Sequence, residues 1–441
     1  MKFLFPFFLF IQLFPFLLKA DNKEKIYSTN EFLCSMGVCV HIQHGQNPEK
    51  LADNLNFIGI NNVRDGADKN YNVDNLILLC KKTNSKAVIG PGSGAIEEDI
   101  PKVMEMAKSL HKENALLAIE GPNEPNNFGG IVFNNIHGGE NDSWLPVAEF
   151  QIKFYNEIKK DKFLKKYPVF GISEVGATTD NVGLQFLEIL KDGKYPFKKG
   201  TKFADFLNCH NYMYHPSWMG IHPNQIWNAA SPENDCRVDG LYGNHCITWK
   251  NHFKGYEPSQ LNLVPKVTTE TGVRVGDENN EITEHIQGCN YMNLFLAQFK
   301  RGWTYTFIYE LIDDGDGAFG FFKSDYITKR LSADYMHNFT SILKSEKSGN
   351  ISVKIPKFYV TNVSDQIHYL LLSNDKNFFL IIWGEKTAGE EEAKISFDKN
   401  IKSINIYDPT KGVEMLNTEK NIKNISVVIS DHPIILKISN L

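Results

Sequence analysis

Short apolar segments alternate with amphipathic helical patterns along most of this chain, and that alternation restricts the possible folds more than any other feature. The apolar segments are residues 34–42, 60–65, 87–92, 116–124, 169–176, 206–214, 266–272 and 305–313. Between them, residues 100–113 are amphipathic, and residues 147–161 and 282–301 repeat apolar side chains at i, i+3 and i+4, which is typical of helices. Repeated strand–helix units predict a parallel sheet, and eight of them predict an α/β fold closed into a (β/α)8, or TIM, barrel.

The pattern changes after about residue 345. Residues 358–386 are rich in β-branched and aromatic side chains with turn signals, and residues 393–416 and 425–439 continue this composition. Alternation with close turns predicts a small all-β sandwich. We therefore expect a catalytic barrel over residues 21–343 and a β-sandwich domain over residues 344–441. Whether the first strand after the N-terminal segment also packs on the sandwich is left open.

The N-terminal segment, residues 1–20, has the features of a secretory signal peptide. Lys2 supplies a positive charge, a run rich in Phe and Leu follows, and Ala20 is a small residue at the expected cleavage point. An uncleaved membrane anchor is the alternative, but Pro6 and Pro15 interrupt the run and it is short for a span. No later segment reaches the roughly 18–20 apolar residues of a span, so we expect a secreted protein without a membrane partner after cleavage.

Secretion implies two further expectations. Five Asn-x-Ser/Thr sequons are candidate N-glycosylation sites: Asn141, Asn338, Asn350, Asn362 and Asn424. The chain has seven cysteines, so at least one thiol stays unpaired. Cys236 and Cys246 flank a loop and are the candidate disulfide, whereas Cys209 lies in an apolar strand and is expected to be a buried thiol. The absence of a Cys-x-x-Cys pair gives little support to structural zinc.

The overall charge argues against several function classes. The formal net charge is −5, which predicts no basic field and therefore no nucleic-acid partner. No Gly-x-Gly-x-x-Gly motif follows the first strand, which disfavours dinucleotide binding. We predict no cofactor, and the sequence does not indicate an oligomeric state.

Two glutamates lie at the ends of predicted barrel strands. Glu124 ends the fourth strand, bracketed by Pro122 and Pro125, and Glu270 ends the seventh strand just before Gly272. Most glutamates on a protein are solvated surface residues, but these two follow apolar strand residues at the end of the barrel where active sites form. Retaining cleavage of a glycosidic bond needs one protonated and one ionised carboxyl group across a sugar ring.

The Asn-Glu-Pro sequence on strand four, with a second Glu ending strand seven, resembles the "four/seven" clan of retaining glycoside hydrolases, clan A. The resemblance covers about residues 35–343, and residues 344–441 resemble the β-sandwich that several of its families carry. It implies a secreted, cellulase-like hydrolase of β-linked oligo- or polysaccharides. Glu124 is then the acid/base, Glu270 the nucleophile, and Asn123 a contact of the substrate 2-hydroxyl.

Further positions fit the same resemblance. An arginine ending strand two often holds the nucleophile, and Arg64 stands there. A His-x-Tyr sequence on strand six gives His210, a candidate sugar contact, and Tyr212, a candidate hydrogen-bond donor to Glu270. An ordinary surface arginine and a satisfied core histidine are the alternatives for Arg64 and His210.

Strand eight departs from the clan pattern. A tryptophan often forms the floor of the sugar subsite there, whereas this chain has Tyr309 and Glu310, both candidate substrate contacts. A long insertion after strand six carries Trp218 and Trp227, which either form a sugar platform or pack within the loop. Residues 312–317 are rich in Asp, and we expect a solvated turn there in preference to a calcium site.

Three alternatives to hydrolysis remain at this point. A transglycosylase would use the same two glutamates, so the sequence does not separate it from a hydrolase. A non-catalytic carbohydrate-binding protein on the same barrel would be favoured if either glutamate were missing, and both are present. A metal-dependent hydrolase needs a metal-ligand pattern on strand one that the spacing of His41 and His44 does not match.

Overall fold

The structure is a computed structural model of the whole chain. It describes residues 25–67, 72–128, 130–139, 142–173, 187–188, 197–213, 222–230, 263–276, 282–344, 356–374 and 377–439. All structural statements below concern these residues. The predicted signal peptide, the candidate disulfide and the sequons at Asn141 and Asn350 lie outside them.

Eight parallel strands form the barrel, and each one overlaps a predicted segment; the second and third strands extend beyond theirs by two residues and one residue. In chain order they are β2 (Met36–Cys39), β3 (Asn62–Ala67), β4 (Lys86–Pro91), β5 (Leu116–Glu120), β8 (Val169–Phe170), β9 (Leu207–Asn208), β10 (Lys266–Thr271) and β11 (Tyr305–Ile308). Their order in the sheet is β8-β5-β4-β3-β2-β11-β10-β9. A bridge between Phe170 and Phe206 links the two outer strands, so the barrel is nearly closed. The predicted fold class is confirmed.

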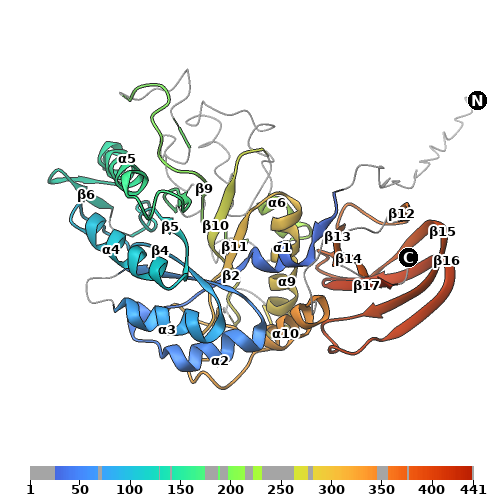
Figure 1. Cartoon of the computed structure of the whole chain (residues 1–441). Helices are drawn as coiled ribbons and strands as arrows, with labels where there is room; N and C mark the ends of the chain where they lie inside the picture. The colour runs from blue at the N-terminus through green and yellow to red at the C-terminus, as the bar shows by residue number, and fades with distance from the viewer. Residues whose placement is uncertain are drawn as a thin grey trace, which may run out of the picture.

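Helices cover the outside of the barrel (Figure 1). They include α2 (Pro48–Ile58), α3 (Val73–Thr83), α4 (Asp99–Lys112), α5 (Leu145–Lys160), α9 (Glu284–Lys300) and α10 (Leu331–Leu343), with short helices α1 (Thr29–Cys34) and α6 (Gln225–Ala229). Local signals set their ends: the Asn47 side chain accepts hydrogen bonds from the first turn of α2, and Gly59 ends that helix with a φ of 72°. A two-stranded hairpin, β6 (Ile131–Phe133) and β7 (Ile136–Gly138), follows the β5 loop.

A second, mostly antiparallel sheet forms the C-terminal region. Its strands are β12 (Phe358–Thr361), β13 (Ile367–Ser373), β14 (Asn377–Gly384), β15 (Glu391–Tyr407), β16 (Asn417–Ile429) and β17 (Pro433–Ser439). The N-terminal strand β1 (Tyr27–Ser28) pairs in parallel with β13. The question that the sequence left open is thereby answered: residues 27–28 belong to the second sheet, although the predicted boundary assigned them to the barrel.

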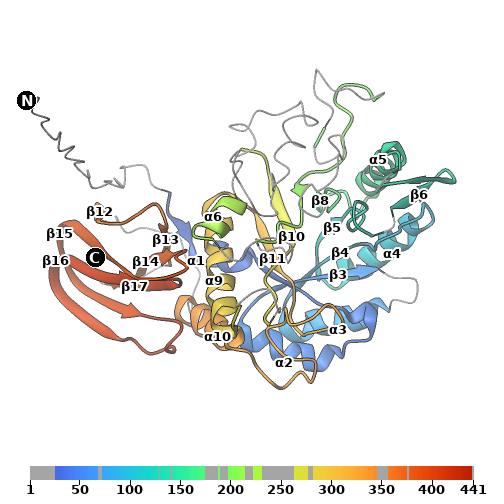
Figure 2. The ribbon, with the colours of Figure 1, turned by 180° about the vertical axis from the view of Figure 1, so that it is seen from behind.

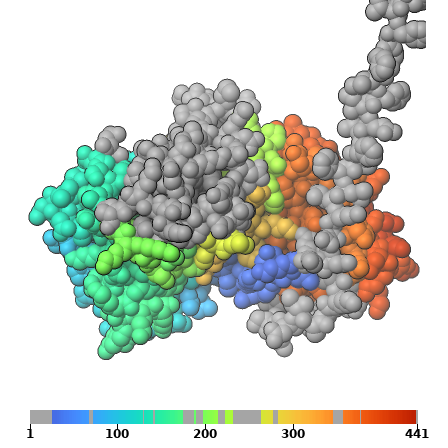
Figure 3. Space-filling view, turned by 90° about the horizontal axis from the view of Figure 1, so that it is seen from above, coloured from blue at the N-terminus to red at the C-terminus, as the bar shows by residue number. Residues whose placement is uncertain are grey.

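The two regions pack against each other through the N-terminal residues and α9. In the space-filling view the blue N-terminal residues lie beside the orange C-terminal region (Figure 3). From behind, α6, α9 and α10 stand between the barrel strands and the second sheet (Figure 2). Asn293 of α9 donates hydrogen bonds from Nδ2 to the carbonyl oxygens of Gly384 and Asp431, which fixes the helix to two loops of that sheet.

The inside of the barrel is filled by a small cluster of side chains. Its buried members are Cys39, Val88, Ala118, Phe170, Val267, Phe307 and Tyr309. They come from six of the eight strands, with Tyr309 directly after β11, so the barrel interior is a packed core below the mouth. Within the described residues, no helix has the length and apolarity needed to cross a membrane.

Candidate active site

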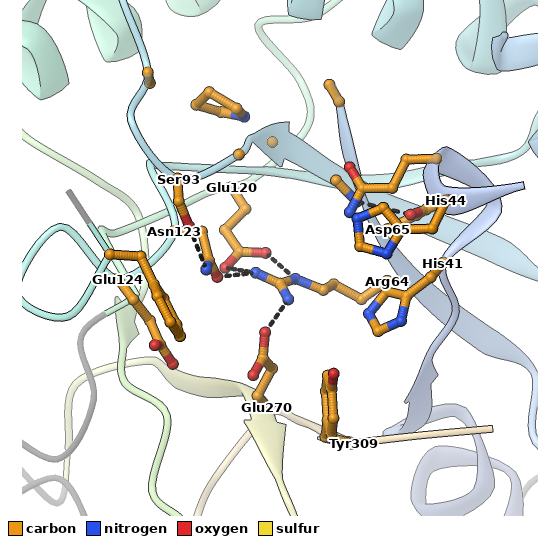
Figure 4. Close-up of a pocket in the computed structure, with 18 of the residues that line it drawn as sticks. His41, His44, Arg64, Asp65, Ser93, Glu120, Asn123, Glu124, Glu270 and Tyr309 are labelled. Carbon is orange, nitrogen blue, oxygen red and sulfur yellow. Dashed lines mark hydrogen bonds and ion pairs between the residues drawn. The ribbon is translucent and has the colours of Figure 1, made fainter. Parts of the chain in front are cut away.

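A cavity of about 620 Å³ opens at the carboxyl ends of the barrel strands. Arg64, Glu120, Asn123, Glu124, Glu270 and Tyr309 are among its lining residues. They come from strands β3, β5, β10 and β11 and from the loop after β5, and Figure 4 shows them converging. Polar groups gather there because parallel strands of a barrel all end at one rim.

Glu270 lies near the end of β10 with only 8% of its surface exposed. Arg64 pairs with its Oε1 through Nη1, and the Tyr212 hydroxyl donates to its Oε2 over 2.8 Å. Burial raises the pKa of this carboxyl, but the charges of His210 and Arg64 and the Tyr212 hydrogen bond outweigh it and lower the pKa. Both contacts expected from the sequence are therefore present, and they favour an ionised group.

Glu124 lies in the loop after β5 and is 3% exposed. Its backbone has a φ of 40°, and its N–H donates to the carbonyl of Ser173 over 2.7 Å, so this loop is tied to the next strand's end. The Oε1 atom lies 2.5 Å from Nδ1 of His210, and Nδ2 of Asn127 donates to Oε2 over 3.0 Å. The unusual backbone conformation therefore turns the carboxyl toward strand six.

The two carboxyl groups meet across His210. One oxygen of Glu124, one oxygen of Glu270 and a ring nitrogen of His210 all lie within 4.8 Å of one another. Burial lowers the pKa of His210, but the charges of Glu270 and Glu124 outweigh burial and raise it. The histidine is 0% exposed and does not line the cavity. It therefore holds Glu124 in position, and the predicted contact of His210 with the sugar is corrected.

Glu120, which the sequence analysis did not select, binds the same arginine. Its Oε2 accepts from Nε of Arg64 over 2.9 Å and its Oε1 accepts from Nη2 over 3.1 Å. Asn208 and Thr269 also donate to Oε1, over 3.2 and 2.7 Å. A bidentate pair of this kind fixes the plane of the guanidinium and so aims Nη1 at Glu270. The only sequence signal was a carboxyl group ending an otherwise apolar strand.

Asn123 is the third residue that accepts a hydrogen bond from the Arg64 guanidinium. Its Oδ1 accepts from Nη2 of Arg64 over 2.7 Å, and its Nδ2 donates to the Ser93 hydroxyl over 3.2 Å. Both residues line the cavity, and Figure 4 shows the amide beside Glu124. The amide is thus held at a place where a bound hydroxyl could meet it.

Tyr309 forms the cavity wall at the position where the clan often has tryptophan. Its ring packs on Phe319 at 5.4 Å and on His41 at 5.4 Å between centroids, and its hydroxyl donates to Asp316 over 2.6 Å. Glu310 is 1% exposed and does not line the cavity. Its Oε1 accepts from the N–H of Asp314. Glu310 therefore lies behind Tyr309, and the predicted contact of Glu310 with the sugar is corrected.

A second charged network lies beside this wall. Nδ1 of His41 is 3.2 Å from Glu310 and also pairs with Asp314. Burial lowers the pKa of His41, but the hydrogen bonds and charges of these two carboxyl groups raise it to about 10. Burial raises the pKa of Glu310 to about 8, while the pKa of Asp314 is about 2, because its bonds to His41 and Asp316 outweigh burial. Residues 314–317 form the expected turn, and Gly315 and Asp316 are exposed in it, but the partly buried Asp314 also pairs with His41 of the barrel.

The other predicted residues lie elsewhere. Trp218 is outside the described residues, whereas the Trp227 ring stacks on His368 at 3.9 Å and so packs against the C-terminal sheet.

Cys209 is buried, as expected. Among the sequons, Asn362 and Asn424 are exposed. The Nδ2 atoms of Asn338 and Asn362 donate to the carbonyls of Pro409 and Glu392 over 2.8 and 3.0 Å. Glycosylation stays a prediction.

Metal binding at the cavity is possible by position but disfavoured by charge. Within the described part of the chain, Glu124, His210 and Glu270 could hold an ion, as could His41, His44 and Asp314. The guanidinium of Arg64 contacts Glu270 and keeps its charge, so a divalent ion at the first place would face a positive charge at contact distance. At the second place His41 would have to give up its proton and its pairing with Asp314 before it could bind an ion.

Comparison with known proteins establishes the fold. No known protein family and no curated protein sequence matches the chain. A family 39 glycoside hydrolase from Bacteroides cellulosilyticus WH2 superposes with a TM-score of 0.59 at 14% identity, over 94% of this chain and 82% of that one. A family 30 subfamily 8 xylanase from Clostridium acetobutylicum gives 0.54 at 8% identity, over 92% and 96%. A family 30 endoxylanase from Clostridium papyrosolvens C71 gives 0.52 at 12% identity, over the same shares.

Proposed function

We propose that this protein is a retaining glycoside hydrolase that cleaves β-linked carbohydrate by double displacement. The observation that carries the proposal is the pair of buried carboxyl groups, Glu124 and Glu270, whose nearest oxygens lie within 4.8 Å at the carboxyl end of the barrel. The fold shared with glycoside hydrolases of families 39 and 30 supports the same class.

The separation of the two groups supports a retaining course. Retaining enzymes hold their carboxyl groups about 5–5.5 Å apart, whereas inverting enzymes need about 6.5–9.5 Å to admit a water molecule between the base and the sugar. The nearest oxygens of Glu124 and Glu270 lie within 4.8 Å, which favours direct attack of the nucleophile on the anomeric carbon.

The surroundings divide the two roles. Glu270, whose pKa is lowered by His210, Arg64 and Tyr212 against the effect of burial, is the ionised nucleophile. Glu124 contacts His210 and Asn127 and lacks the arginine and tyrosine contacts of Glu270, and in this proposal it gives its proton to the leaving oxygen. A glycosyl ester forms on Glu270. Glu124 then takes a proton from water, the water oxygen attacks the anomeric carbon, and Glu270 leaves as the carboxylate.

The site also has the means to position a sugar. Asn123 is held between Arg64 and Ser93, and Tyr309 offers an aromatic wall. Because residues 1–20 read as a signal peptide, we propose that the substrate is an extracellular oligo- or polysaccharide. A sugar acceptor in place of water would give transglycosylation with the same residues, and product analysis separates the two.

Chemical rescue tests the assignment. Activity on an aryl β-glycoside chosen from a panel should fall by about 10⁴-fold or more in Glu270→Ala, because the loss of a nucleophile removes the covalent step. Azide should restore turnover of Glu270→Ala as the α-glycosyl azide and of Glu124→Ala as the β-glycosyl azide. The matched control is Glu105→Ala, at an exposed position on the outer helix α4.

Two results would contradict the proposal. Wild-type rates in both glutamate variants would leave the barrel without this chemistry. Binding of oligosaccharides that is unaffected by either variant, with no turnover by the wild-type protein on any member of the panel, would favour a carbohydrate-binding protein.

A further inference from the structure

Outside the lining of the cavity, a group of metal-ligating side chains joins helix α9 to the C-terminal sheet. His285 and Cys289 stand one helical turn apart on α9, so both face the same side of the helix. Asp431 lies in the turn between β16 and β17. One donor atom from each of the three lies within 4.8 Å of the others. The glycosidase mechanism uses none of them.

The distances match those of a tetrahedral zinc site. With bonds of about 2.3 Å to sulfur and about 2.0–2.2 Å to nitrogen and oxygen, tetrahedral geometry separates sulfur and nitrogen by about 3.6 Å and nitrogen and oxygen by about 3.3 Å. Here Sγ of Cys289 lies 3.6 Å from Nε2 of His285, and that nitrogen lies 3.2 Å from Oδ2 of Asp431. Two of the three donor–donor separations therefore have the lengths of such a tetrahedron, and the third, from sulfur to oxygen, is within 4.8 Å.

Outer contacts orient the three donors. A metal-bound histidine usually uses its second ring nitrogen to bond a fixed partner, and Nδ1 of His285 lies 3.0 Å from the Tyr335 hydroxyl. Nδ1 of His432 lies 2.8 Å from Oδ1 of Asp431, the oxygen that the proposed ion does not use. Asn293, farther along α9, donates to the Asp431 carbonyl over 2.8 Å and holds the turn against the helix.

We propose that His285, Cys289 and Asp431 form a structural zinc site that fastens the barrel to the C-terminal sheet. Thiolate and imidazole ligands favour zinc over calcium or magnesium, which prefer oxygen alone. The side chains of His285 and Asp431 are 43% and 34% exposed, so an ion can enter from solvent, while Cys289 is buried at the inner side.

Binding must release the thiol proton. Zinc binds the thiolate form of Cys289, so the proton passes to water and a Zn–S bond forms without any change of oxidation state. The sequence analysis found little support for zinc because it searched for paired cysteines, whereas these ligands come from a His-x-x-x-Cys helix and a distant turn.

Cobalt provides the test, because a thiolate bound to Co²⁺ gives a charge-transfer band that oxygen and nitrogen ligands do not. The full chain, stripped with a chelator, should bind Co²⁺ with that band, and Zn²⁺ should remove it by displacement. Cys289→Ser should lose the band. The control Cys80→Ser, which removes another buried thiol, on helix α3, should keep it.

A second measurement covers the case in which Cys289→Ser does not fold. His285→Ala changes a partly exposed side chain, and it should weaken Co²⁺ binding at least about tenfold, as loss of one ligand does. Added Zn²⁺ should raise the Tm of the wild-type protein and of Cys80→Ser but not that of His285→Ala. Absence of the band in the wild-type protein, or its persistence in Cys289→Ser, overturns the zinc site and leaves the glycosidase proposal untouched.

Discussion

The cavity is flanked by two charged networks built on different cations, one on Arg64 and one on His41. Arg64 contacts Glu120 and Glu270, and His41 contacts Glu310 and Asp314. Both pair a buried cation with two carboxyl groups. The difference is that a guanidinium stays charged at all working pH values, whereas an imidazole can lose its proton.

The residues that each cation contacts indicate what each network does. The Arg64 network includes Glu270 itself, so it acts on the proposed nucleophile by contact. The His41 network reaches Glu270 only through its charge, and its effect on the pKa of Glu270 is smaller than that of Arg64. We therefore expect the first network to control catalysis and the second to control the pH range and the stability of the wall.

The largest effect should come from Arg64→Lys. Lysine keeps the positive charge but loses the fork that binds Glu120 and aims at Glu270. We expect kcat to fall by about 10²–10³-fold, the range found when one preorganised donor is removed from an active site. The acidic limb of the pH–rate profile should move little, because the charge remains. A loss below tenfold would mean that charge alone suffices and that the fork is not needed.

Glu120→Gln should have the next largest effect. The amide can keep one hydrogen bond to Arg64 but not the bidentate pair, and a shift of the guanidinium of about 1 Å can cost up to about 10²-fold in rate. Removing a negative charge near Glu270 should also move the acidic limb to lower pH. Steady-state kinetics over pH measure both effects, and an unchanged kcat at the optimum would contradict a positioning role for Glu120.

Replacing His41 by Asn should change the rate at the optimum by only about threefold, because its charge acts on Glu270 without contact. The pKa of Glu270 should rise, so the acidic limb should move to higher pH. A shift as large as that of an Arg64→Met variant would remove the distinction between the two networks. His111→Asn, on the outer helix α4, is the control.

The same variant tests a pH dependence of stability. The folded pKa of His41, about 10, lies above its unfolded value, so its contribution is complete below pH ~6.5 and is lost as the pH rises to about 10. Glu310, with a folded pKa of about 8, acts in the same direction. The Tm of the wild-type protein should fall across this window, and the fall should be smaller in His41→Asn. The ring of His44, 5.1 Å from that of His41, faces the same network.

The sequence predicted the barrel well because each strand is an apolar segment that ends in a polar or glycine-rich turn. All eight segments overlap a barrel strand, and the ends of the fourth and seventh carry the two glutamates that meet. Contacts such as Arg64 with Glu270, 206 residues apart, follow from this topology, because strand ends share one rim.

What the sequence did not predict depends on which way a side chain faces. Glu120 and Glu310 stand at similar strand ends, yet the first lines the cavity beside Arg64 and the second lies behind Tyr309. A shift of one residue reverses the face of a strand, and apolar patterns place strand ends only within a few residues. The pairing of β1 with β13 was likewise invisible, because a two-residue strand carries no pattern.

Tyr309→Phe should have the smallest effect, and it tests whether the two networks communicate through the wall that separates them. The Tyr309 ring lies between His41 and Tyr212, at 5.4 and 6.4 Å from their rings, and its hydroxyl donates to Asp316. Phenylalanine keeps the wall and loses one hydrogen bond, so kcat/KM should change by less than about fivefold. Tyr309→Ala removes the wall and should raise KM far more than it lowers kcat, because an aromatic platform binds the ground state and the transition state alike. If Tyr309→Phe instead moved the acidic limb as far as His41→Asn does, the hydroxyl would be part of the electrostatic coupling, and the two networks would have to be treated as one.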